Sequence, residues 1–120
     1  MASALGYQFL DGKKKEVKPI GANLSSIETI DVSNVNSKLK DVSFSIACDV
    51  TNPLYGENGA AHIYSAQKGA TPDDILLLDQ GLRDFSKLLN VVFNIDSQSV
   101  IGAGAAGGMG IASKVFLDVN

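Results

Sequence analysis

The most regular pattern of apolar residues lies in the second half of the chain. Apolar side chains recur there every three or four positions, at Ile75, Leu78, Leu82, Phe85 and Leu89. This spacing places them on one stripe of an amphipathic helix, with Asp79, Arg83 and Lys87 to one side. Thr71 can cap the first turn, and Pro72 needs no amide donor there. The pattern predicts a helix that begins after Thr71, and core packing alone accounts for it.

The first half of the chain is richer in short stretches suited to β-strands. Residues 5–10 and 14–20 flank Asp11-Gly12, a dipeptide that favours a tight turn and predicts a hairpin. Residues 28–32 carry β-branched side chains that indicate a further strand. Residues 42–48 are predominantly apolar and precede the turn at Thr51-Asn52-Pro53, so they predict a buried strand, the strongest in the chain.

Helical segments and strands are interleaved along the chain. Residues 22–27 favour a short helix, residues 36–40 a surface connection, and a last helix is expected from the glycine-rich segment through Phe116. A chain of 120 residues is long enough for one hydrophobic core and too short for two. We therefore expect a single domain over residues 1–120, of the α/β class, with a mixed sheet flanked by helices.

Composition and charge exclude several classes of partner. The net charge of -3 is spread over both signs, without the basic face of a nucleic-acid-binding protein. No stretch approaches the ~20 apolar residues of a membrane span. Cys48 is the only cysteine, which excludes an internal disulfide and a cysteine-rich zinc site and fits a reducing compartment. We expect a cytoplasmic protein without a nucleic-acid or membrane partner.

Polar residues follow the predicted strand at residues 42–48. Asp49 would lie at its end, where open α/β sheets present ligand-binding groups, and phosphoryl transfer requires a carboxylate to hold Mg²⁺ or to accept a proton. Asp49 and Asn52 are equally typical of turns, in which they bond local amides before Pro53. The residues by themselves favour this local interpretation.

The segment from Gly56 to Ala70 also has two interpretations. Its small residues would let backbone amides approach a ligand, and Lys68 offers a mobile cation for an anionic oxygen. Alternatively, the segment is a short helix that ends at Gly69, with Lys68 placed against the negative end of the helix dipole. His62 has no cysteine or histidine partner at ligand spacing, so no metal site is expected.

A glycine-rich run, Gly102 to Gly110, precedes the last predicted helix. It matches the G-x-G-x-x-G dinucleotide pattern, but the sequence that follows leaves no room for a complete βαβ unit. Lys and Ser or Thr do not follow Gly107, so a phosphate-binding P-loop is excluded as well. A glycine-rich turn at a helix start remains, which binds an anion or lets elements pack closely.

These segments together resemble the glycerate kinase family. The resemblance rests on ordered segments that span nearly the whole chain: Ala4 to Gly6, Ile30 to Ser33, Ala47 to Leu54, Gly56 to Ala60, Gln67 to Ala70, Thr71 to Asp79 and Gly102 to Gly110. It implies part of a two-domain α/β kinase, resembling most of the smaller domain. The family's upstream and downstream signature motifs have no counterpart in this sequence, so we expect a fragment that is inactive alone.

The resemblance also implies a reaction and a set of site residues. The intact enzyme would phosphorylate D-glycerate to phosphoglycerate with ATP and Mg²⁺. Asp49 would be the catalytic carboxylate; Asn52, Lys68 and the glycines 104, 107 and 108 would bind substrate. Expected partners are D-glycerate, ATP and the missing remainder of the kinase, and a homo-oligomer remains open. The alternative is a domain remnant without catalysis, which binds a ligand or forms dimers.

Overall fold

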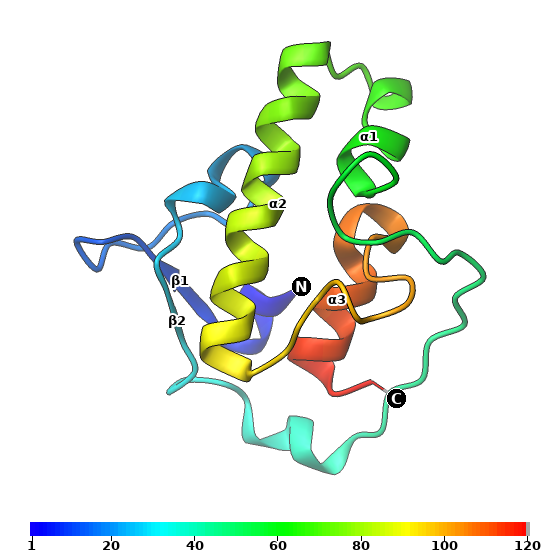
Figure 1. Ribbon diagram of the computed structural model, residues 1–120. Helices are drawn as coiled ribbons and strands as arrows, with labels where there is room; N and C mark the ends of the chain where they lie inside the picture. Colours follow the sequence, from blue (N-terminus) through cyan, green and yellow to red (C-terminus); the bar gives the residue numbers. More distant parts are fainter. Residues whose placement is uncertain (120) are drawn as a thin grey trace.

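The long helix α2, Pro72–Phe93, runs through the middle of the molecule in this computed structural model, which describes residues 1–119 (Figure 1). Its start confirms the prediction. Asp74 N donates to Thr71 Oγ1 over 3.2 Å, and Thr71 N donates to the Asp74 carboxylate over 2.8 Å. This reciprocal capping box satisfies amides that the first helical turn leaves without a partner. The helix ends at Phe93, and Asn94 caps it in the left-handed region at φ 55°.

Two shorter α-helices pack beside α2. Helix α1 spans Ala60–Tyr64, and helix α3 spans Ala105–Leu117, where the last helix was expected. Short 3₁₀-helices occupy Ala2–Leu5, Gly21–Ser26, Ser37–Asp41 and Ala66–Lys68. The turn at Gly21–Ser26 packs against α2, because Gly81 of that helix leaves room for its backbone and for Leu24.

The sheet consists of two antiparallel strands, β1 (Gln8–Leu10) and β2 (Thr29–Asp31). Phe9 lies opposite Ile30, and both side chains are buried. The predicted hairpin is wrong in its second arm. Asp11 accepts amide hydrogen bonds from Lys13 and Lys15, but only a single bridge, between residues 10 and 16, follows the turn. Strand β2, whose Ile30 side chain is buried in the core, pairs with β1 in place of the predicted second arm.

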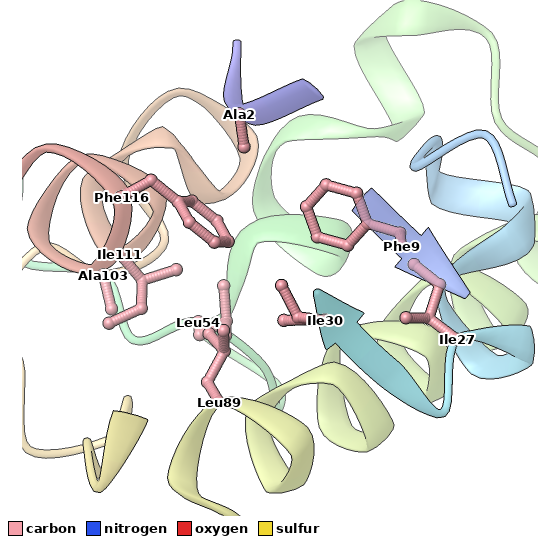
Figure 2. Close-up of a cluster of buried hydrophobic side chains, with 9 residues drawn as sticks. All are labelled: Ala2, Phe9, Ile27, Ile30, Leu54, Leu89, Ala103, Ile111 and Phe116. Atoms are coloured by element: carbon pink, nitrogen blue, oxygen red, sulfur yellow. The ribbon is translucent and has the colours of Figure 1, made fainter. Parts of the chain in front are cut away.

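The hydrophobic core joins the sheet to helices α2 and α3 and to the loop before α1 (Figure 2). Leu54 and Leu89 have no exposed surface and lie between the sheet side and the α3 side of the cluster. Phe116 of α3 meets Phe9 edge to face at 5.9 Å between ring centroids, and Phe93 of α2 at 5.8 Å. Such geometry adds to the free energy gained from burial. The core therefore connects the first strand to the last helix.

The strand predicted for residues 42–48 is not present. These residues form no regular element, and Val42 and Ile46 are 51% and 47% exposed. A strand needs a neighbouring ladder, and the two strands of the described chain pair with each other. The expected α/β class is confirmed, but within residues 1–119 the sheet is an antiparallel pair and not the mixed sheet that we predicted. No helix in the described part of the chain has the length and apolar character to span a membrane.

Candidate functional site

Four of the six predicted site residues line two neighbouring hollows; Asn52 and Gly104 line neither. The first, of about 390 Å³, is lined by Lys68, Gly107 and Gly108 together with many apolar side chains. The second, of about 550 Å³, is lined by Asp49. Tyr64, Ala106 and Met109 line both hollows and form a partition between them. Asp49 and Lys68 therefore lie on either side of one partition and not on unrelated surfaces.

Asn52 anchors Tyr64, one of the three residues of this partition. The Tyr64 hydroxyl donates to Asn52 Oδ1 over 2.9 Å, and Asn52 Nδ2 donates to the carbonyl of Asn58 over 3.0 Å. Both ends of the Asn52 side chain are thus engaged within the protein, in contacts that fix the Tyr64 ring. The substrate-binding role of Asn52 stays a prediction. Tyr64 was not among the predicted site residues, because an aromatic residue in a short helix carries no signal of its own.

The glycine-rich turn enters helix α3 through left-handed backbone. Ala106, Gly107 and Gly108 have φ angles of 52°, 79° and 107°. The amides of Gly107 and Gly108 both donate to the carbonyl of Gly104, over 3.1 and 3.2 Å. The Gly104 amide donates to the carbonyl of Asn52 over 3.0 Å. An anion held by these three amides would therefore have to replace hydrogen bonds that the turn already makes.

The glycines of this turn differ in the space around them. A side-chain carbon at Gly104 would overlap the carbonyl oxygen of Pro53, and one at Gly110 would overlap that of Gly102. At Gly107, nothing lies within 4 Å of that position. Gly104 and Gly110 thus allow close packing of backbone against backbone, one of the two functions considered for this run. Gly107 is open to solvent and to a ligand.

Lys68 lies at the mouth of the first hollow. It ends the short 3₁₀-helix Ala66–Lys68, which Gly69 closes in the left-handed region at φ 95°, so the predicted glycine cap is confirmed. The Lys68 side chain is exposed, and within residues 1–119 it forms no ion pair. It can therefore reorient toward an anion in the hollow. Its role in binding stays a prediction.

Asp49 is exposed beside the second hollow, next to Cys48. It is not at the end of a strand, because residues 42–48 do not form one. Among the described residues, no three histidine, cysteine or acidic side chains come close enough to hold a metal ion. Asp49 thus offers one carboxylate to a ligand, and its catalytic role stays a prediction.

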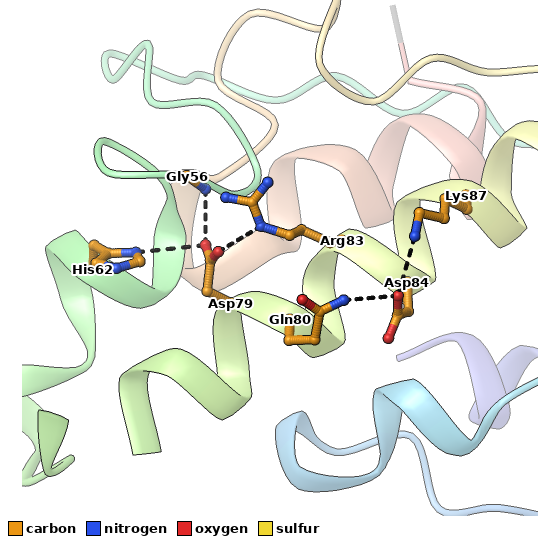
Figure 3. A network of polar contacts seen from close by, with 7 residues as sticks. All are labelled: Gly56, His62, Asp79, Gln80, Arg83, Asp84 and Lys87. Atoms are coloured by element: carbon orange, nitrogen blue, oxygen red, sulfur yellow. Dashed lines mark hydrogen bonds and ion pairs between the residues drawn. The ribbon is translucent and has the colours of Figure 1, made fainter. Parts of the chain in front are cut away.

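A buried carboxylate, Asp79, organises the neighbouring loop, which the sequence did not indicate (Figure 3). Asp79 is 5% exposed and accepts hydrogen bonds from Gly56 N and from Arg83 Nε, both over 2.8 Å. His62 Nδ1 lies 3.5 Å from the same carboxylate. Arg83 also stacks over the Tyr55 ring, 4.6 Å from its centroid. The sequence pattern placed Asp79 and Arg83 only to one side of the apolar stripe of the helix, at the i,i+4 spacing that their ion pair uses.

Two opposing effects set the pKa of Asp79. Burial of the carboxyl raises its pKa. The hydrogen bonds from Gly56 and Arg83, with the charges of Arg83 and His62, outweigh burial and leave the pKa below its ordinary value. Asp79 is therefore ionised at neutral pH. It fastens the loop that carries Leu54 and Gly56, and with it helix α1, to helix α2.

Known proteins resemble this chain over its whole length. The model of the "Glycerate kinase family" matches residues 1–120. Glycerate 2-kinase of Escherichia coli K12 is 42% identical over 117 residues, which are 98% of this chain and 31% of that protein. Glycerate kinase of Bacillus cereus is 43% identical over 112 residues, which are 93% of this chain and 29% of that protein.

A crystal structure described as glycerate kinase 2 from Salmonella typhimurium LT2 has the same fold. It matches with a TM-score of 0.94 and 37% identity, over 100% of this chain and 32% of that chain. The chain therefore spans about a third of the length of the relatives that it matches.

Proposed function

This chain belongs to the glycerate kinase family, and on that basis we propose that it forms part of an enzyme that transfers the γ-phosphoryl group of ATP to a hydroxyl group of D-glycerate. The observation that carries the proposal is the family match over all 120 residues. Two further findings support it: relatives named glycerate kinase, and a TM-score of 0.94 to the Salmonella typhimurium structure.

The first hollow has a cation that suits anionic reactants, but most of its lining is apolar. Glycerate and ATP both carry negative charge, and phosphoryl transfer depends on positioning and on charge stabilisation. We assign Lys68 to an anionic oxygen of the substrate, because it is the exposed cation at the mouth of the first hollow. Gly107 leaves room for that group to approach the turn. The apolar depth of the first hollow does not suit glycerate, so we place the substrate at its mouth.

This chain would supply only some of the ligands of a bound Mg²⁺ ion. ATP-dependent enzymes commonly bind Mg²⁺ through one or two carboxylates together with the phosphate oxygens and water. Asp49 can supply one such carboxylate, and the described residues contain no larger cluster of ligands. When bound, the ion would offset the charge of the phosphates. In this proposal Asp49 orients the reactants from the second hollow, across the partition from Lys68.

We also propose that the isolated chain is inactive. It spans about a third of the kinases that it matches, so most of the surface that would enclose ATP and glycerate lies outside it. Closing an active site requires groups on both sides of the reactants. Assays of catalysis therefore need the longer protein.

A chimera tests the proposal. The matching third of E. coli glycerate 2-kinase is replaced by this chain, and ADP formation is followed in a coupled assay with ATP and D-glycerate. We expect glycerate-dependent ADP formation by the chimera and none by the isolated chain. A folded chimera that forms no phosphoglycerate would contradict the proposed function.

Variants of Lys68 make the test specific. Loss of one charge-assisted hydrogen bond costs about 1.5–3 kcal/mol, so Lys68→Met should raise the KM for glycerate or ATP by roughly tenfold or more. Lys68→Arg should retain much of the affinity, because it keeps the charge. Lys13→Met, which removes an exposed lysine from the turn after β1, is the matched control and should change neither constant. Equal effects of Lys68→Met and Lys13→Met would remove Lys68 from the site.

A further inference from the structure

Residues 43–51 run along the outer edge of the molecule, between the 3₁₀-turn Ser37–Asp41 and the loop before α1 (teal to green in Figure 1). Within residues 1–119, none of their backbone groups takes part in a backbone hydrogen bond. The last backbone hydrogen bond before the segment runs from Val42 N to the carbonyl of Leu39. The first one after it runs from Gly104 N to the carbonyl of Asn52. The carbonyl of Val50 accepts a side-chain hydrogen bond from the Cys48 thiol over 3.4 Å. Nine consecutive residues of the described chain thus make no backbone hydrogen bond to one another or to a neighbouring strand, although the carbonyl of Val50 lies against Gly102.

The side chains of this segment alternate as in a half-buried strand. Every second residue is apolar, and the residues between them are small or polar: Val42, Phe44, Ile46, Cys48 and Val50 alternate with Ser43, Ser45, Ala47, Asp49 and Thr51. Such alternation over a run of this length is typical of a strand with one face covered. Val42 and Ile46 are nevertheless about half exposed. Phe44 and Val50 are half-buried, so this apolar face is only partly covered. A row of unpaired amides beside such a face is a template for strand addition.

The occupant follows from the comparison with the longer kinase structure. That structure matches this chain over its whole length, residues 43–51 included, with a TM-score of 0.94, yet this chain covers only 32% of it. About two thirds of that longer chain therefore lies outside the matched part and is available to pack against the segment. We propose that residues 43–51 are a docking strand, and that its partner is a β-strand from the part of the kinase that this chain does not contain. This proposal does not rest on the phosphoryl-transfer reaction.

Hydrogen exchange, read by mass spectrometry, tests the pairing. The isolated chain is compared with the chimera in which it replaces the matching third of E. coli glycerate 2-kinase. We expect amides 43–51 to exchange at least ~100-fold more slowly in the chimera, because strand pairing protects amides that are open in the isolated chain. Amides of α2 should be protected in both and serve as the internal reference. Equal exchange of residues 43–51 in both proteins, with α2 protected in both, would overturn the proposal.

Substitutions at Ser45 separate pairing from packing. Ser45→Pro removes one backbone donor in the middle of the segment, whereas Ser45→Ala keeps it. In the isolated chain, where Ser45 is exposed and unpaired, we expect both variants to unfold at the same urea concentration as the parent. In the chimera, Ser45→Pro should lower the unfolding midpoint and Ser45→Ala should not. Identical behaviour of the two variants in the chimera would contradict the pairing.

A measurement on the isolated chain alone keeps the proposal testable if the chimera does not fold. Cys48 is exposed and belongs to the apolar face of the segment. We expect iodoacetamide to alkylate it in the native chain within roughly threefold of the rate in the urea-unfolded chain, at every protein concentration. A rate that falls as concentration rises, together with a dimer in light scattering, would assign the strand to a second copy and overturn the proposal. A protected thiol in the monomer would mean that the partner lies within this chain, with the same consequence.

Discussion

Two adjacent stretches of this chain, residues 43–51 and residues 54–93, differ in where their partners lie. The second contains α1 and α2, and its cap, its buried carboxylate and its core leucines all find partners within the chain. The first has a strand sequence but forms no ladder within residues 1–119, and its side chains there are exposed or half-buried. A regular pattern in a sequence therefore reports what a segment requires, and the segment forms only where the rest of the structure supplies it.

The largest expected effect comes from truncating one leucine of the core. Leu54→Ala should lower the free energy of unfolding by about 2–5 kcal/mol, because Leu54 has no exposed surface and its loss leaves a cavity. Ile46→Ala is the matched change in the other stretch and should cost less than about 0.5 kcal/mol, because its side chain is 47% exposed. Urea denaturation of the isolated chain measures both. A large effect of Ile46→Ala would remove the difference between the two stretches.

The glycine-rich turn allows a second comparison, between a packed and an open glycine. Gly104→Ala should cost about 3 kcal/mol, since its new carbon overlaps the Pro53 carbonyl and the backbone must shift. Gly107→Ala should cost only about 1 kcal/mol, which is the strain of a left-handed residue with an open surrounding. Thermal unfolding of both variants gives the comparison. If Gly107→Ala were the more damaging, the assignment of Gly104 to close packing would fail.

Asp79 connects the loop before α1 to α2, and its removal should loosen this connection. Asp79→Asn should cost about 2 kcal/mol, because the Gly56 amide and Arg83 lose a charged acceptor. Asp73→Asn, on the exposed first turn of the same helix, is the control and should cost well under about 1 kcal/mol. Chemical denaturation with both variants tests this. Equal costs would show that the Asp79 network adds nothing beyond surface charge.

The same carboxylate gives a smaller, pH-dependent effect. Because the folded protein lowers the pKa of Asp79, this group stabilises the fold above its unfolded pKa of about 3.9, and that contribution is lost as pH falls through the folded pKa. The stability difference between the parent and Asp79→Asn should therefore be constant from neutral pH down to about pH 5 and shrink below it. Denaturation midpoints at a series of pH values provide the measurement. A difference that grows on acidification would contradict the lowered pKa.

The sequence indicated the parts of the fold that depend on neighbours in the chain. The start of α2 at Thr71 could be read directly, because caps are local interactions. The glycine cap at Gly69, also local, was one of the two interpretations of its segment. The strand at residues 42–48 could not, because its composition does not say whether a partner is present. The family resemblance, which depends on ordered motifs, was confirmed over the whole chain.

The candidate site was indicated only in outline. Lys68 and the glycine-rich turn do line one hollow, and Asp49 lines its neighbour. Tyr64 as the partition and Asp79 as the buried anchor depend on contacts between elements, which residue types alone do not specify. The amides of Gly107 and Gly108 bond to the carbonyl of Gly104, an arrangement that only backbone geometry reveals.

Backbone ¹⁵N order parameters of the isolated chain test the difference between the two stretches most directly. Packed helices give values near ~0.85, and flexible segments fall below ~0.6. We predict the higher value along α2 and the lower value for residues 43–51, in a monomer at low concentration. Uniformly high values through residues 43–51 in that monomer would contradict the account, because the segment would then be held by this chain alone.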